Sequence, residues 1–112
     1  MKFVLLIYQP KGFDPKALSK GEYKAVADQY AAVSATPKIR PGLPLGLARD
    51  AVTVRVCDGE IVTTSGPHLD EPLGGYFELE AEALEEAIQL AARIPAARLG
   101  GAIEVRPSQV YW

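Results

Sequence analysis

The residues with the clearest chemical potential lie together between Ser65 and Glu71. This segment holds the only histidine of the chain, His68, with Asp70 two residues later. An imidazole titrates near neutral pH, so it can accept or donate a proton, and a nearby carboxylate would orient it and stabilise its charged form. We therefore predict His68 and Asp70 as catalytic candidates for proton transfer. The alternative is that both are solvated turn residues.

Other polar side chains are candidates for binding a small organic ligand. Two of them flank the histidine, and four are expected on strands where they could face a common space. The ligand-binding candidates are Ser65, Glu71, Tyr8, Tyr76, Arg55 and Arg106. The two arginines could instead pair with glutamates of the same sheet face, because opposite charges on neighbouring strands attract each other.

The composition excludes several classes of site. One histidine and one cysteine are too few for a zinc site or an internal disulfide. Cys57 has no histidine near it in the sequence, so we interpret it as a small hydrophobic residue or inert thiol. No glycine-rich phosphate loop or nucleophile elbow is present. We predict no metal and no cofactor.

The charge and hydropathy patterns exclude two classes of partner. The formal net charge is -2, without the clustered Lys and Arg that nucleic-acid binding requires. No apolar run approaches the roughly 20 residues of a membrane span. The apolar start of the chain lacks a cleavage site and is broken by Gln9-Pro10, so we do not expect it to be a signal peptide. We expect a cytoplasmic protein.

A chain of 112 residues with 48% hydrophobic residues predicts a single domain, residues 1–112, with its own core. A fully apolar run predicts a first strand covered on both faces, and alternation or helical spacing predicts the other elements. Ser19 and Glu22 have capping-box spacing, and Asp58-Gly59 predicts a tight hairpin turn. The expected strands are 3–8, 52–57, 60–64, 75–80 and 102–106, the expected helices are 20–34 and 82–94, and the proline-rich segment 36–46 is expected to be a loop.

The apolar stripe of the first helix (Tyr23, Val26, Ala27, Tyr30 and Val33) is expected to pack in the core. The order is strand, helix, hairpin with an added strand, helix, strand, which is typical of the α+β ferredoxin-like βαββαβ fold with an antiparallel sheet. Two helices cover only one face of such a sheet. The other face would carry Arg55, Tyr76, Glu78, Glu104 and Arg106 among apolar residues, so we expect a homodimer formed through this sheet face. The apolar tail 110–112 is expected to pack on the partner subunit.

Several blocks of this sequence resemble the YCII-related family, and more narrowly its DGPF-domain branch. The resemblance covers residues 1–107 and rests on Leu73-Gly-Gly-Tyr-Phe, on Ala91-Ala-Arg-Ile-Pro, and on Glu104-Val-Arg-Pro. It implies a dimeric α+β barrel built from two ferredoxin-like subunits. It implies no particular reaction, because the family has no settled activity.

The chain departs from the family pattern at the positions that matter for chemistry. The first helix has no histidine, and Ile94 stands where the shorter members carry an aspartate before proline. Ser65 and His68 replace the Asp and Phe of the DGPF signature. Two functions follow as alternatives. One is a homodimer that binds a small organic ligand near residues 65–72, with proton transfer at His68, and the other is a non-catalytic interaction or regulatory module.

Overall fold

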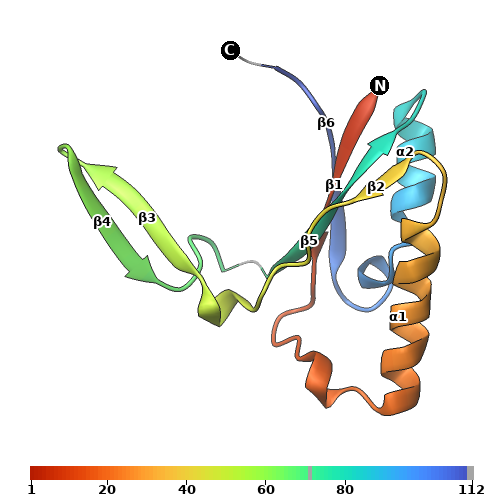
Figure 1. The fold of residues 1–112 in the computed structure, drawn as a ribbon, viewed down its shortest axis with the longest axis horizontal. Coiled ribbons are helices and arrows are strands. Elements are labelled where there is room, and N and C mark those ends of the chain that lie inside the picture. The colour runs from red at the N-terminus through yellow and green to blue at the C-terminus, as the bar shows by residue number, and fades with distance from the viewer. Residues whose placement is uncertain (71, 111–112) are drawn as a thin grey trace.

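Two α-helices and two antiparallel sheets make up the described part of the chain (Figure 1). The computed structural model describes residues 1–70 and 72–110. Three short 3-10 turns, at Pro15–Ala17, Ala48–Asp50 and Pro95–Ala97, lie in the connections. The strands are β1 (Lys2–Tyr8), β2 (Ile39–Pro41), β3 (Val52–Cys57), β4 (Glu60–Ser65), β5 (Leu73–Glu80) and β6 (Ala102–Pro107), and the helices are α1 (Lys20–Ser34) and α2 (Leu84–Ala91). The expected α+β class is confirmed.

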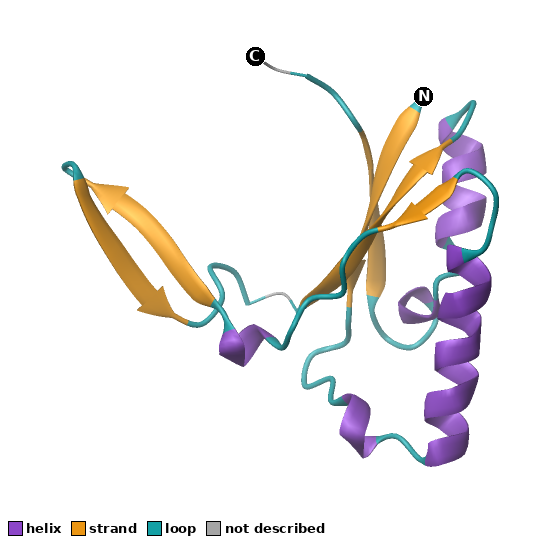
Figure 2. Cartoon of the chain, viewed as in Figure 1, coloured by secondary structure: helices purple, strands orange, loops and turns teal. Residues whose placement is uncertain are grey.

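The main sheet has four strands in the order β2-β5-β1-β6, and its pairs are antiparallel. β1 lies in the middle, with Leu5 opposite Phe77 of β5 and Val105 of β6. Both helices lie on one side of this sheet (Figure 2). The arrangement is compatible with a ferredoxin-like fold.

The core lies between the helices and one face of the sheet. Phe3, Leu5 and Ile7 of β1 are 5% exposed or less, because alternate residues of a strand point to the same face. They pack with residues of β5 and the helical layer. Val4 and Leu6 point to the other face and stay half-buried. Within one chain, the described elements therefore cover only one of the two faces of β1 fully.

Helix α1 has the expected bounds, and its start is fixed by local hydrogen bonds. The Ser19 hydroxyl accepts a bond from the Glu22 amide at 3.1 Å, and the Glu22 carboxylate accepts one from the Ser19 amide at 3.0 Å. These bonds lower the pKa of the exposed Glu22 carboxyl. The prediction that the apolar stripe of α1 packs in the core is confirmed for the C-terminal part of the helix, where Val33 is buried and Tyr30 packs against the core. It is wrong for Tyr23, which is exposed, because the N-terminal part of the helix stands off the sheet.

The largest departure from expectation is the position of the hairpin. Strands β3 and β4 form at the expected residues, but they make a two-stranded sheet of their own and do not join the four-stranded sheet. Their place beside β5 is taken by β2, inside the segment that we expected to be a loop. A proline is tolerated there because β2 is an edge strand and Pro41 is its last residue.

Helix α2 is shorter than expected, and the chain then closes tightly on β1. Ile94 is extended (φ -72°, ψ 125°), as the residue before a proline usually is. The Gly101 amide donates to the Ala96 carbonyl at 2.9 Å, and a Cβ on Gly101 would lie 2.1 Å from the Tyr8 carbonyl oxygen. Only glycine therefore fits where this connection passes the end of β1.

We expect Gly101→Ala to lower the free energy of unfolding by about 2–3 kcal/mol, because two backbone segments must separate to admit the methyl group. Urea denaturation followed by circular dichroism measures the change. Gly46→Ala is the matched control, since a Cβ there meets nothing within 4 Å. Equal stability of the two variants would contradict the close approach.

Candidate functional site

The loop between β4 and β5 carries the predicted catalytic residues but does not join them. His68 is exposed and makes no hydrogen bond or ion pair with any described residue. Asp70 Oδ2 instead lies 3.6 Å from Lys11 Nζ, with side chains 98% and 77% exposed. An ion pair this exposed contributes little stability. Glu71 lies outside the described residues.

A small cavity of about 250 Å³ opens beside this loop. Asp70 forms part of its wall together with the cations of Lys11 and Arg49, whereas His68 does not line it. Its remaining lining residues are Gly12, Phe13, Leu47, Ala48, Pro67 and Pro72. The cavity offers charges of both signs to a polar molecule, but no proton-transfer pair.

The face of the sheet opposite the helices brings together several predicted ligand-binding residues. Leu6 of β1 lies opposite Tyr76 of β5 and Glu104 of β6, and Tyr8 lies two residues further along the same face. The Nε of Arg106 donates to the carboxylate of Glu104, which lies two residues earlier in the same strand. This bond runs along β6, so it does not test the expected pairing between neighbouring strands.

The remaining two ligand-binding candidates lie elsewhere. Arg55 and Ser65 belong to the separate hairpin and are exposed. Our placement of Arg55 on the same sheet face as Glu104 is therefore wrong. The reason is that the hairpin leaves the main sheet, which the alternation within β3 cannot indicate.

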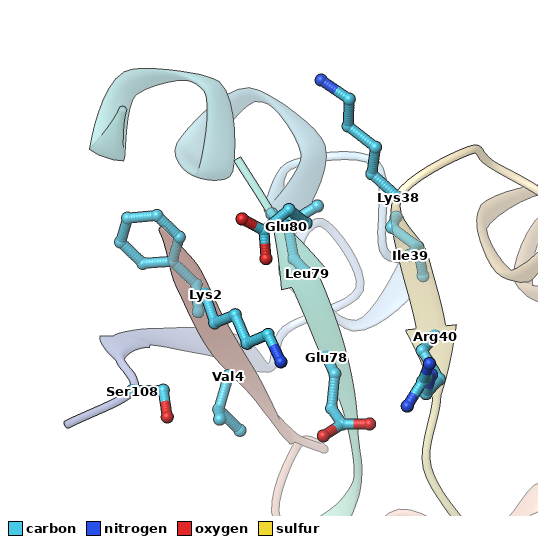
Figure 3. Close-up of a pocket in the computed structure, with 10 residues that line it drawn as sticks. Lys2, Val4, Lys38, Ile39, Arg40, Glu78, Leu79, Glu80 and Ser108 are labelled. Atoms are coloured by element: carbon cyan, nitrogen blue, oxygen red, sulfur yellow. The ribbon is translucent and has the colours of Figure 1, made fainter. Parts of the chain in front are cut away.

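A second cavity, of about 320 Å³, lies on the open face of the sheet near its β2 edge (Figure 3). Arg40 is paired in register with Glu78, and Lys2 with Glu80. Lys38 points away from Glu78 (Figure 3). Cations and carboxylates surround Val4 on this part of the open face. This arrangement suits the polar rim of a protein interface better than a pocket for one charged group.

A larger cavity, of about 430 Å³, separates α1 from the sheet. Most of its wall is apolar, and its volume falls in the range of small-molecule sites. The polar side chains in the wall are Gln9, Tyr23, Tyr30 and Ser34. The other lining residues are Ile7, Phe13, Pro15, Leu18, Val26, Ala27, Pro41, Gly42, Leu43, Pro44, Gly74, Gly75, Tyr76 and Phe77.

Two polar groups in this cavity are held in place by each other. The Gln9 amide Nε2 donates to the Tyr30 hydroxyl at 3.3 Å. Because a hydroxyl can accept and donate at once, the Tyr30 proton stays available to a ligand, as does the Gln9 amide oxygen. Gln9 reaches this position beside an irregularity in the β1–β5 register, where its side chain packs 3.0 Å from the ideal Cβ position of Gly74.

The sequence contained a signal for this cavity that we did not use. Ala27 of α1 and the glycines Gly74 and Gly75 of β5 line opposite elements of the cavity, and their small side chains leave its space unfilled. Tyr23 and Tyr30 line the same cavity, and Tyr30 also packs against the core. Of the predicted site residues that the structure describes, only Tyr76 is part of this wall.

Position 94, where the shorter members of the YCII-related family carry an aspartate, lies in the core of this chain. Ile94 is 0% exposed and Pro95 is also buried. Among the described residues, no group of three or more His, Cys, Asp or Glu side chains could hold a metal ion. No described helix is both long and apolar enough to cross a membrane.

The sequence matches no protein-family model and no curated protein. The resemblance to the YCII-related family therefore stays a prediction from the sequence blocks quoted above.

Position 94 does not accommodate an acidic residue, because it lies in the core. We expect Ile94→Asp to destabilise the fold by about 4 kcal/mol or more, because it removes a buried aliphatic side chain and buries a carboxyl without a partner. Thermal and urea unfolding measure the loss. Ala97→Asp, at an exposed position of the following turn, is the control and should change stability by less than about 0.5 kcal/mol. A folded Ile94→Asp variant of unchanged stability would show that the site is open.

Proposed function

We propose that this chain acts as a homodimer that binds a small, mainly apolar organic molecule between α1 and the sheet. The observation that carries the ligand half of the proposal is the 430 Å³ cavity with the Gln9–Tyr30 hydrogen bond in its wall. An apolar space with a few fixed polar groups is the usual form of a small-molecule site. The ligand would have a carbonyl or hydroxyl group to meet the Tyr30 hydroxyl.

Binding without proton transfer is the form of the proposal that the geometry supports best. His68 and Asp70 are exposed and do not contact each other. Neither lines the cavity beside α1. We expected a ligand near residues 65–72, and the small cavity beside Asp70 lies in this region.

The dimer half of the proposal rests on surface area. The chain exposes 8187 Å², whereas a folded monomer of 12.1 kDa should expose about 6,000 Å². Its radius of gyration is 15.9 Å, against about 13 Å for a compact chain of this length. The excess exceeds the roughly 800 Å² that each partner buries in a standard interface.

The open face of the sheet is the surface that we propose to pair. Its centre is formed by Val4, Leu6 and the two tyrosines Tyr8 and Tyr76, and charged residues surround it. Counting the β3–β4 hairpin as an insertion, the remaining elements follow the βαββαβ order. Two such sheets packed face to face would form the dimeric α+β barrel that the family resemblance implies.

The dimer proposal predicts that one charge in the centre of the face separates the subunits. Leu6→Lys should raise the dimer dissociation constant at least about 100-fold, because a buried ammonium replaces an apolar contact. Sedimentation equilibrium measures the change, and circular dichroism confirms folding. Leu99→Lys, at an exposed leucine outside the open face, is the matched control. A wild-type chain that stays monomeric at millimolar concentration would refute the dimer.

The ligand proposal predicts that filling the cavity blocks binding. We expect the apolar dye 8-anilinonaphthalene-1-sulfonate to bind in fluorescence titrations, and Ala27→Trp to weaken it at least about tenfold because indole occupies the same space. Ala25→Trp places the same side chain at an exposed position of α1 that does not line the cavity, so it should leave binding unchanged. Equal affinity of the two variants would favour the non-catalytic interaction module without a ligand.

A further inference from the structure

The β3–β4 hairpin, residues 52–65, extends from the body of the molecule as a separate arm (Figure 1). Its tip turns at Asp58 and Gly59, which have φ values of 50° and 79°. Its base is closed by the Gly66 amide, which donates to the Ala51 carbonyl at 2.7 Å. A two-stranded ribbon is marginally stable in water unless it packs on something else.

The register gives the arm two different faces. Val52 lies opposite Ser65, Val54 opposite Thr63, and Val56 opposite Ile61, so all six side chains share one face. This is the aliphatic face of the arm. The four large aliphatic side chains on it are exposed at 64% for Val52, 61% for Val54, 69% for Val56 and 74% for Ile61. The other face carries Arg55 and Glu60 beside Thr53 and Thr64.

We propose that the aliphatic face of the arm docks on a second copy of this chain. The contact presupposes the homodimer proposed above and adds a second surface to it. The surface excess of about 2,000 Å² over a monomer of this mass is more than one standard interface requires from each partner. An arm exposed on both faces accounts for part of this excess.

The arrangement of the chain favours a second copy as the occupant. The open face of the sheet looks away from the helices and toward the side where the arm extends (Figures 1 and 2). A copy seated on this face would stand beside the arm. Two-fold symmetry would then bury both arms equally, since an isologous contact uses each surface twice.

The chemistry of the arm disfavours other classes of partner. Residues 52–65 contain one arginine, one aspartate and one glutamate, and no lysine or aromatic residue. Nucleic acid and anionic membranes are recognised by clustered basic residues, and membrane interfaces also by aromatic ones. A neutral aliphatic surface matches the apolar centre of a protein interface.

Two substitutions of the same kind test the proposal on the full chain. Val54→Lys places a charge on the aliphatic face, and Val62→Lys makes the same change on the other face of the same hairpin. We expect Val54→Lys to raise the dimer dissociation constant at least tenfold and Val62→Lys less than threefold, both measured by sedimentation equilibrium. Far-UV circular dichroism checks that each variant folds.

A second measurement uses the single cysteine of the chain. Cys57 is exposed and lies near the tip on the face opposite the valines, so a benzophenone label there leaves the aliphatic face open. Irradiation should give covalent dimers with the wild type and with Val62→Lys, and few with Val54→Lys.

The outcomes separate the two proposals. A dimer that Leu6→Lys dissociates, but that Val54→Lys leaves intact and without cross-links, would overturn the arm contact and keep the sheet-face dimer. Equal weakening by Val54→Lys and Val62→Lys would also overturn it, because the effect would not depend on the face. A wild-type chain that is monomeric and cross-links to nothing would overturn both.

Discussion

The structure depends on one constraint: the two helices bury only one face of the sheet. Leu5 is 0% exposed between the sheet and the helical layer, while Leu6, its neighbour in β1, points away from that layer and stays half-buried. With a chain of 112 residues, no further described element covers the second face. The apolar side chains of β1 on this face are therefore the ones that the proposed homodimer would bury.

The way in which the two ends of α1 are held explains why the cavity lies between this helix and the sheet. The helix is held at its C-terminal end by Val33, while its start is fixed by the capping box of Ser19 and Glu22, which needs no contact with the sheet. Local hydrogen bonds can therefore keep the helix regular where it stands off the core. The Gln9–Tyr30 bond then links the loop after β1 to the helix and limits how far they separate.

Features that depend on neighbouring residues could be predicted from the sequence. The bounds of α1 follow from its capping box and periodicity, and the turn of the hairpin follows from Asp58-Gly59. Features that depend on pairing between segments far apart in the sequence could not be predicted. Nothing within 52–65 indicates that the hairpin leaves the sheet. Strand β2 was not predicted because the segment 36–46 contains prolines, which are excluded from a central strand but tolerated in an edge strand. The cavity was missed since its wall combines residues that lie far apart in the sequence, such as Ala27 and Gly75.

The free backbone edges of the hairpin have a consequence for solubility. Each of its two strands has a single hydrogen-bonded neighbour, so both outer edges offer unpaired amides and carbonyls to any extended peptide. Valine and threonine favour such strand addition, which leads toward fibrils. Arg55, Asp58 and Glu60 place charges along these edges and at the tip. Charged residues beside a strand of high β-propensity are the usual gatekeepers against such self-templated growth.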